Sequence, residues 1–118
     1  MTFNINHGEV WLAKLNPNKG KEPGKTRPVL VLQHQALLDI KHPTSIILPL
    51  TTHLIDNAAP LRIRVAAQDK LEHDSDILID QIRAIDNTRL IKGPLTTCNP
   101  ELLEQVYSAI NEVMGIPG

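Results

Sequence analysis

The chain has 118 residues, 42% of them hydrophobic, and a formal net charge of −1 at pH 7. This length suits one domain over residues 1–118, and the absence of any run of about eighteen apolar residues argues against a signal peptide or a membrane span, so we expect a cytoplasmic protein. The near-neutral charge excludes the strongly basic proteins that hold long duplexes through many phosphates.

The first two strands are expected on either side of a basic loop. Residues 9–15 (EVWLAKL) carry the Val, Trp and Leu typical of a half-buried strand, and residues 27–33 (RPVLVLQ) form a valine-rich run expected at the centre of a sheet. The loop at 16–26 is rich in Gly, Pro and Lys. Five cations crowd this region, which predicts a local binding loop for phosphates: Lys14, Lys19, Lys21, Lys25 and Arg27.

The middle of the chain predicts four further strands. Residues 45–50 (SIILPL) are apolar, and Pro49 marks an edge strand or a bulge because proline cannot donate to a sheet ladder. Residues 61–65 (LRIRV) alternate strictly, so their apolar side chains should point inward and their arginines outward. Residues 76–82 (DILIDQI) and 89–92 (RLIK) are separated by turn-forming Asp86-Asn87.

One helix is strongly indicated, over residues 100–114. Asn99 supplies an N-cap, Pro100 suits the first helical position, and Gly115 ends the helix. Its apolar residues form one stripe that must pack on the sheet: Leu102, Leu103, Val106, Ile110, Val113 and Met114. Short strands followed by one helix indicate a mainly β, α+β domain, a strongly curved, barrel-like sheet capped by that helix.

Neither an internal disulfide nor a metal or cofactor site is expected. Cys98 is the single cysteine; it is interpreted as a plain small residue, although its place before a helix start would favour a lower thiol pKa. His34 and His42 stand in loop-like sequence and are interpreted as solvated rather than as metal ligands.

Three ordered motifs carry a resemblance to a known family. The first comprises Gly8-Glu9-Val10-Trp11, Leu15-Asn16-Pro17, Gly20-Lys21-Glu22 and residues 26–32 (TRPVLVL); the second is Pro49-Leu50-Thr51-Thr52; the third is residues 80–85 (DQIRAI) with Arg89-Leu90. In order and spacing they are similar to the motifs of MazF/PemK toxins, over residues 8 to 114. A valine-rich strand alone would be weak support, whereas three ordered motifs are hard to obtain by chance.

The resemblance implies a fold, an activity and partners. The fold is an SH3-like curved β-barrel that forms a homodimer. The activity is that of a toxin endoribonuclease, which cuts single-stranded RNA such as mRNA through attack of the RNA's own 2′-hydroxyl, leaves a cyclic phosphate and needs no metal. The protein partner is an antitoxin, and the basic loop gives this pairing a physical basis, because an acidic, disordered tail would lie across the same groove as RNA.

The resemblance also implies two catalytic residues, Arg27 and Thr51. The reaction needs a base for the 2′-hydroxyl, stabilisation of a phosphorane and protonation of the 5′-oxygen. Arg27 offers a guanidinium fork to two phosphoryl oxygens, with a surface ion pair to Glu22 as the alternative. Thr51 offers one hydrogen bond to an oxyanion, while Thr52 would point to the opposite side; the alternative is that both threonines only satisfy backbone groups at a strand end.

The general base is left open, because an arginine with a pKa above about 12 is almost never deprotonated in a protein. Glu22 would orient or polarise Arg27, and His53 has a suitable pKa but is interpreted as a bystander. The other supporting residues would bind RNA: Lys21, Lys25, Thr52, Gln81 and Arg83. Gln81 would read base edges, and Arg83 would meet phosphate or complete an internal ion pair.

Two other functions fit the same fold. A non-catalytic toxin would bind a DNA topoisomerase through the terminal helix, although this helix ends without charged or aromatic anchors. A module that only binds a partner, or an enzyme that has lost its activity, is the third possibility. Loss of RNA cleavage in a folded Arg27→Ala variant would separate the enzyme from both.

Overall fold

The first two strands form an antiparallel pair. The structure, a computed structural model, describes residues 4–15 and 25–117. β1 (Glu9–Lys14) and β2 (Thr26–Val31) lie where the sequence predicts strands, and their register runs from Val10 opposite Leu30 to Lys14 opposite Thr26. Most of the predicted basic loop lies outside the described residues.

β3 (Thr44–Thr51) is an interior strand with three partners, β2, β5 and β6. Of the two features that Pro49 is predicted to mark, the edge strand is therefore wrong, since Pro49 pairs with Val29 of β2 in the interior of the sheet. On the other side of β3, Pro49 falls between Ile47, which pairs with β6, and Leu50, which pairs with β5. Proline is tolerated here because its missing N–H coincides with a break in the ladder.

β4 (Arg62–Val65) and β5 (Ser75–Leu78) pair with each other, and β5 also pairs with the end of β3. Ile63 and Val65 are buried, as the alternation predicts, but Leu61 is 50% exposed. The inward prediction fails for Leu61 because the strand begins one residue later, so the pleat does not govern its direction.

The predicted strand at 76–82 is two strands with a turn between them. β5 ends at Leu78, a 3₁₀ turn η1 (Ile79–Gln81) follows, and β6 (Arg83–Asp86) pairs with the first half of β3. A second 3₁₀ turn, η2 (Asn87–Arg89), confirms the turn expected at this point and leads into β7 (Leu90–Thr97), which pairs with β1. A short helix, α1 (Gln35–Asp39), follows β2 without having been predicted.

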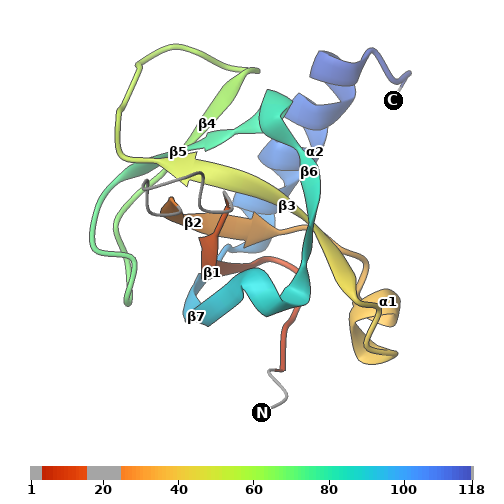
Figure 1. The fold of residues 1–118 in the computed structure, drawn as a ribbon. Coiled ribbons are helices and arrows are strands. Elements are labelled where there is room, and N and C mark those ends of the chain that lie inside the picture. The colour runs from red at the N-terminus through yellow and green to blue at the C-terminus, as the bar shows by residue number, and fades with distance from the viewer. Residues whose placement is uncertain (1–3, 16–24, 118) are drawn as a thin grey trace, which may run out of the picture.

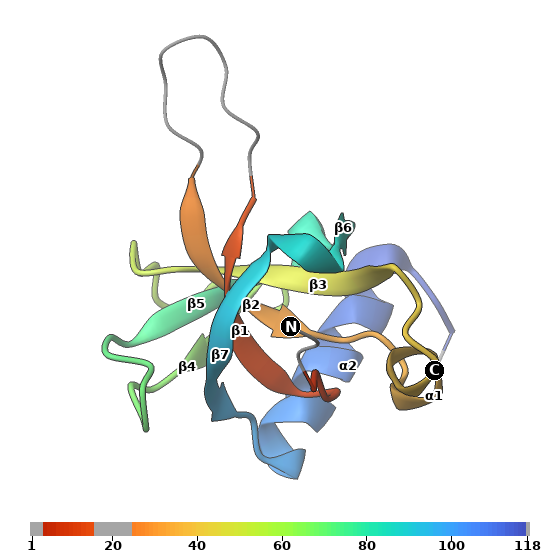
Figure 2. The same ribbon diagram turned by 60° about the horizontal axis from the view of Figure 1, so that its bottom comes forward.

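The sheet order is β4-β5-β3-β2-β1-β7, with β6 beside β3, and the sheet curves strongly around its core (Figures 1 and 2). This confirms the mainly β, curved, barrel-like class with a terminal helix, although the hydrogen-bonded path does not close into a full barrel within the described residues. α2 (Pro100–Met114) begins after Asn99, whose side chain accepts from the Leu102 amide, and ends at Gly115 with φ 69°. Both predicted helix ends are confirmed.

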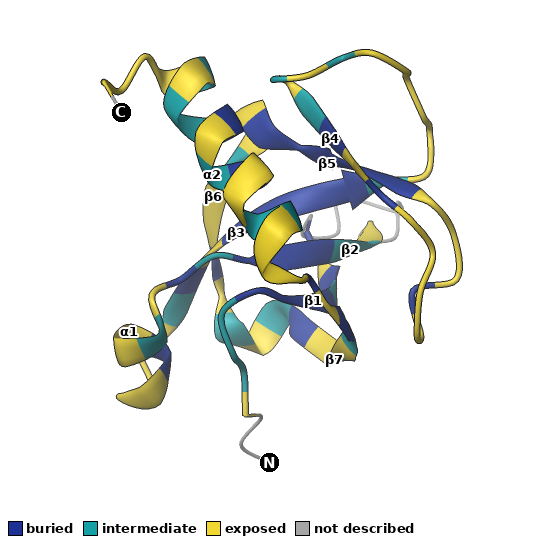
Figure 3. Ribbon diagram, turned by 180° about the vertical axis from the view of Figure 1, so that it is seen from behind, coloured by how far each residue is buried: buried dark blue, intermediate teal, exposed yellow. Residues whose placement is uncertain are grey.

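Both faces of the sheet are buried, by different parts of the chain. Val10, Leu30 and Leu48 belong to one cluster, which includes Val106 and Ala109 of α2, and Figure 3 shows this helix lying on the sheet with its outer side exposed. Trp11, Val29 and Ile47 belong to a second cluster, because their side chains point to the opposite face of the same strands. Met114, at the end of the predicted apolar stripe, is 57% exposed. No helix among the described residues is long and apolar enough to cross a membrane.

Candidate active site

A basic hollow of about 310 Å³ lies where β2 begins and the η1 turn meets β6. Seven residues line this basic hollow: Leu15, Lys25, Arg27, Pro49, Leu78, Gln81 and Arg83. Three of them are cationic, and none of these described lining residues is acidic. A chain with a net charge of −1 therefore presents a local site whose charge favours an anion.

Arg27 lies on an interior strand, and no described residue engages its guanidinium. Its backbone pairs with Ala13 of β1, and its side chain is half-buried. Among the described residues, Arg27 makes no side-chain hydrogen bond or ion pair. No described acceptor therefore competes with two oxygens of an anion for its fork. Glu22, the alternative partner considered from the sequence, lies outside the described residues.

Thr51 lies close to the point where β2 and β3 separate. The pairing of these strands ends at Val29 opposite Pro49, and on the other side of β3 Thr51 pairs with Asp76 of β5. Extending the β2–β3 register by two residues would set Arg27 opposite Thr51, on the face shared by Val29 and Pro49. Thr51 itself is not among the residues that line the basic hollow.

The two threonines lie in different surroundings. Thr52 is exposed and lines a separate hollow of about 250 Å³ together with Pro28 and Ser75. The Thr51 Oγ1 accepts a hydrogen bond from the His53 amide at 3.1 Å, which is the strand-end contact that the sequence leaves open. That bond occupies one lone pair of the hydroxyl and leaves its proton free to be donated.

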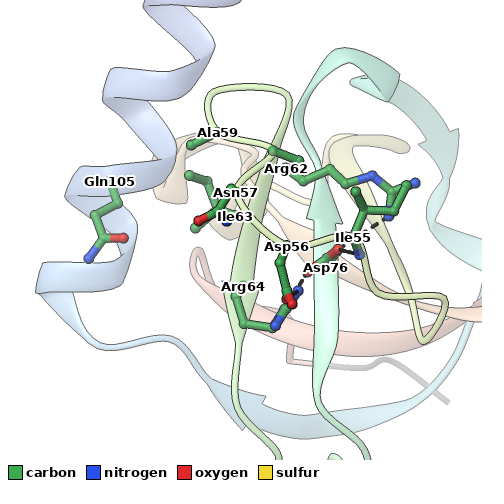
Figure 4. Close-up of a pocket in the computed structure, with 10 residues that line it drawn as sticks. Ile55, Asp56, Asn57, Ala59, Arg62, Ile63, Arg64, Asp76 and Gln105 are labelled. Atoms are coloured by element: carbon green, nitrogen blue, oxygen red, sulfur yellow. Dashed lines mark hydrogen bonds and ion pairs between the residues drawn. The ribbon is translucent and has the colours of Figure 1, made fainter.

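An ion-pair network fixes the chain that follows Thr51 (Figure 4). The Asp76 carboxylate is 2% exposed and accepts from Arg64 Nε at 2.6 Å and from Arg62 Nη1 at 3.2 Å. It also accepts from the Ile55 amide at 2.9 Å. Burial alone would raise the pKa of Asp76, but the hydrogen bonds from both arginines and the amide outweigh it and lower the pKa.

The sequence reasoning missed this network, although its signal was present. Asp76 is the single charged residue in a strand that otherwise reads as buried, and a buried carboxylate requires partners. Arg62 and Arg64 lie on one face of the neighbouring strand, β4. In the β4–β5 register, Arg62 pairs with Leu78 and Arg64 pairs with Asp76. The alternation alone predicts only that both arginines point outward.

The third motif contributes to the basic hollow and to its rim. Gln81 is exposed in η1 and lines the basic hollow. Arg83 donates to the Leu15 carbonyl at 3.4 Å, a long contact, and it forms no ion pair with any described residue. Arg89, to which no role was assigned from the sequence, donates to the same carbonyl at 2.9 Å. These bonds anchor the end of β1 beside the basic loop.

The remaining candidate residues are placed as follows. Lys25 is exposed at the rim of the basic hollow, whereas Lys21 lies outside the described residues with Glu22. His53 is exposed, and its carbonyl accepts from Arg62 Nη1 at 2.9 Å. In the described part of the chain, no three His, Cys, Asp or Glu side chains gather as metal ligands would. Burial raises the pKa of Cys98 to about 11, so the lower pKa favoured by the nearby helix start is wrong.

Comparisons with known proteins agree with this fold and these motifs. Residues 6–114 match the family model of PemK-like, MazF-like toxins of type II toxin-antitoxin systems. The chain is 33% identical over 113 residues to the protein named endoribonuclease MazF of Staphylococcus saprophyticus. The match covers 95% of this chain and 92% of that protein.

Solved structures share the fold at lower identity. The Mycobacterium tuberculosis toxin MazF-mt6 superposes with a TM-score of 0.76 at 19% identity, over 93% of this chain and 99% of that chain. A MazE-MazF crystal structure from Deinococcus radiodurans gives a TM-score of 0.79 at 20% identity, over 98% of this chain and 100% of that chain. The match of the family model over most of the chain, together with the 33% identical relative, decides the assignment. This chain belongs to the PemK-like, MazF-like toxin family of type II toxin-antitoxin systems.

Proposed function

We propose that this chain is a toxin that cuts single-stranded RNA, including mRNA, in a sequence-selective way and without a metal. The observation that carries the proposal is the basic hollow, in which, among the described residues, Arg27 has no protein partner and no acidic side chain lines the wall. The name of the 33% identical relative, endoribonuclease MazF, supports the same reaction class. A guanidinium fork aimed into a concave basic site is suited to a phosphodiester.

The proposed reaction is attack of the RNA 2′-hydroxyl on the adjacent phosphorus, which releases the 5′-oxygen and leaves a cyclic phosphate. Arg27 binds two phosphoryl oxygens and stabilises the charge that develops on them. Thr51 donates its hydroxyl proton to one of those oxygens, which its bond from the His53 amide leaves it free to do. Glu22 orients Arg27; the general base is not assigned to His53, whose exposed position and backbone bond to Arg62 fit a bystander.

RNA recognition is assigned to the wall and rim of the basic hollow. Lys25 and Arg83 bind phosphates on either side of the cleaved bond, with Lys21 beside them on the basic loop, and Gln81 reads one base edge. The chain has three aromatic residues, so base stacking contributes little and hydrogen bonds with pocket shape supply most of the selectivity. Thr52, on the other hollow, would contact the RNA chain beyond the cut site.

The partners follow the same chemistry. We assign to the antitoxin an acidic, disordered segment that lies in the basic hollow in place of RNA, which would neutralise its three cationic lining residues. Structures with a similar fold include MazE-MazF complexes and an endoribonuclease with its cognate antitoxin. We also propose that the toxin is a homodimer and acts in the cytoplasm, where its RNA substrate and its antitoxin are made.

The test is cleavage of a mixed-sequence single-stranded RNA in EDTA by the full chain and three variants, Arg27→Ala, Arg27→Lys and Thr51→Ala. The wild type should give discrete cuts ending in a cyclic phosphate. Arg27→Ala should abolish them, and Arg27→Lys should restore RNA binding without restoring the rate, because lysine keeps the charge but not the fork. Circular dichroism establishes that each variant is folded.

Two outcomes would contradict the proposal. RNA left intact by the wild type, with inhibition of a topoisomerase instead, would favour the non-catalytic toxin. Cuts that persist unchanged in a folded Arg27→Ala variant would mean that the active site lies elsewhere.

A further inference from the structure

We propose that Arg62, itself held by the buried carboxylate of Asp76, is a positioning residue that sets the direction of the Thr51 hydroxyl. Arg62 lies on β4, its described hydrogen bonds go to His53 and Asp76 rather than to Thr51, and it is not among the residues that line the basic hollow. It acts through the backbone of the turn that leaves β3. The inference rests on the proposed function, because Thr51 is a catalytic residue only if the chain cuts RNA.

A continuous set of contacts joins Arg62 to Thr51. Arg62 Nη1 donates to the His53 carbonyl at 2.9 Å and to Asp76 Oδ2 at 3.2 Å, so one nitrogen bridges the turn and the carboxylate. The amide of the same residue, His53, donates to Thr51 Oγ1 at 3.1 Å. Holding the His53 carbonyl therefore restrains the amide that orients the hydroxyl, since only the φ and ψ torsions of His53 separate these two groups.

Asp76 provides the rigid base of this arrangement. It lies in β5 directly opposite Thr51 in the β3–β5 register, and its side chain is 2% exposed. The same Oδ2 atom accepts from the Ile55 amide at 2.9 Å, two residues beyond His53. The turn is thus tied to β5 directly at Ile55 and through Arg62 at His53. Figure 4 shows the contacts of Ile55 and Arg62 with Asp76.

The chemical consequence concerns which part of the hydroxyl remains available. With one lone pair occupied by the His53 amide, the oxygen has a fixed place and its proton is directed away from that amide. Without the contact, the Thr51 side chain is free to populate other staggered rotamers, and only a fraction of molecules would present the proton to the phosphate. The expected effect is on the chemical step rather than on RNA binding.

Arg64 provides a matched control within the same network. It lies two residues along the same strand and makes the shorter bond to Asp76, 2.6 Å from Nε to Oδ1, and a second ion pair to Asp56 at 2.9 Å. It makes no bond to His53 or to any other described residue of the turn between Thr51 and Ile55. A purely structural role for the network predicts that loss of Arg64 is at least as harmful as loss of Arg62.

The experiment compares full-length wild type, Arg62→Ala, Arg62→Lys and Arg64→Ala at a temperature where all are folded. Single-turnover and steady-state cleavage of one RNA oligonucleotide give kcat and KM, and NMR hydrogen exchange reports on the His53 amide. Arg62→Ala should lower kcat roughly tenfold or more with KM within about twofold, and should speed exchange of the His53 amide. Arg62→Lys should recover part of kcat, and Arg64→Ala should change kcat by less than about threefold.

The outcomes separate this inference from the function on which it rests. If the wild type cuts RNA and both alanine variants lose kcat in proportion to their loss of thermal stability, the positioning role is wrong. Unchanged His53 exchange in Arg62→Ala overturns it as well, whatever the activity. If the wild type does not cut RNA at all, the proposed function fails and the catalytic role of Arg62 fails with it, while faster exchange would still establish the contact between Arg62 and the turn.

Discussion

Replacing Asp76 with asparagine is expected to destabilise the protein by about 2 to 3 kcal/mol. Removing one member of a buried ion pair costs about 3 to 5 kcal/mol, because the partner's charge is left without compensation. Here the cost is smaller because the side chains of Arg62 and Arg64 are 21% and 39% exposed and would be partly hydrated. At roughly 4 °C per kcal/mol for a domain of this size, Tm should fall by about 8 to 12 °C.

The pH dependence of this loss identifies its cause. The pKa of Asp76 is lowered in the folded protein, so its contribution is fully present above the unfolded value of about 3.9 and is lost as the pH falls toward the folded pKa. The difference in unfolding free energy between wild type and Asp76→Asn should therefore be constant from about pH 5 to 7 and should shrink below about pH 4. Asp86, whose pKa is lowered chiefly by the hydrogen bond from the Thr88 amide, is present in both proteins and cancels in the difference.

Urea unfolding followed by circular dichroism at a series of pH values measures this difference. A difference that stays constant from about pH 5 down to pH 2, or that grows in acid, would show that the Asp76 charge does not stabilise the fold. A Tm equal to that of the wild type at neutral pH would refute the claim that the ion-pair network of Asp76 fixes the chain that follows Thr51.

Three further predictions concern packing and reactivity. Gly93→Ala should lower the free energy of unfolding, measured in urea, by about 1 to 3 kcal/mol, because the new Cβ would lie 2.5 Å from Cδ2 of the buried Trp11. An unfolding free energy equal to that of the wild type would contradict this packing. Gly115→Ala should cost about 1 to 2 kcal/mol although nothing lies within 4 Å, because φ is 69°, and Gly115→Asn should cost less. Cys98, with a pKa raised to about 11 by burial, should resist iodoacetamide in the native protein and react in urea; rapid native labelling would contradict its burial.

The terminal helix was predictable from the sequence because its ends depend on local chemistry. Asn99 accepts from the Leu102 amide, and Gly115 takes a left-handed conformation, and both are properties of single residues and their immediate neighbours. The strand at 76–82 was predicted less well because an apolar run does not reveal its partners. β5 pairs with β4 and the end of β3, whereas β6 pairs with the beginning of β3, so the chain must turn at Ile79–Gln81 to change partners.

The candidate site, too, could be predicted from the sequence only in part. Arg27 is far in sequence from Gln81 and Arg83, and nothing in their local patterns indicates that one hollow would contain all three. Only the family motifs selected them together. The role of Asp76 required knowledge of which strand lies beside it, since its arginine partners stand twelve and fourteen residues earlier in the chain.

The arginines show why position alone would not identify the catalytic candidate. The chain has five arginines, and four of them donate to protein acceptors: Arg62 and Arg64 to Asp76, and Arg83 and Arg89 to the Leu15 carbonyl. A guanidinium already bonded to a buried carboxylate would have to give up that bond before it could bind a phosphate, and the carboxylate would be left charged and unpaired.

Arg27 carries no such penalty. It stands at the start of an interior strand, beside Pro49 in the basic hollow, and it donates to no acceptor that the structure describes. Among the described residues, nothing competes with a ligand for its two parallel hydrogen bonds. An arginine that the fold holds in place through the backbone, and that has no side-chain partner among the described residues, is the one whose loss should abolish anion chemistry and leave stability nearly unchanged.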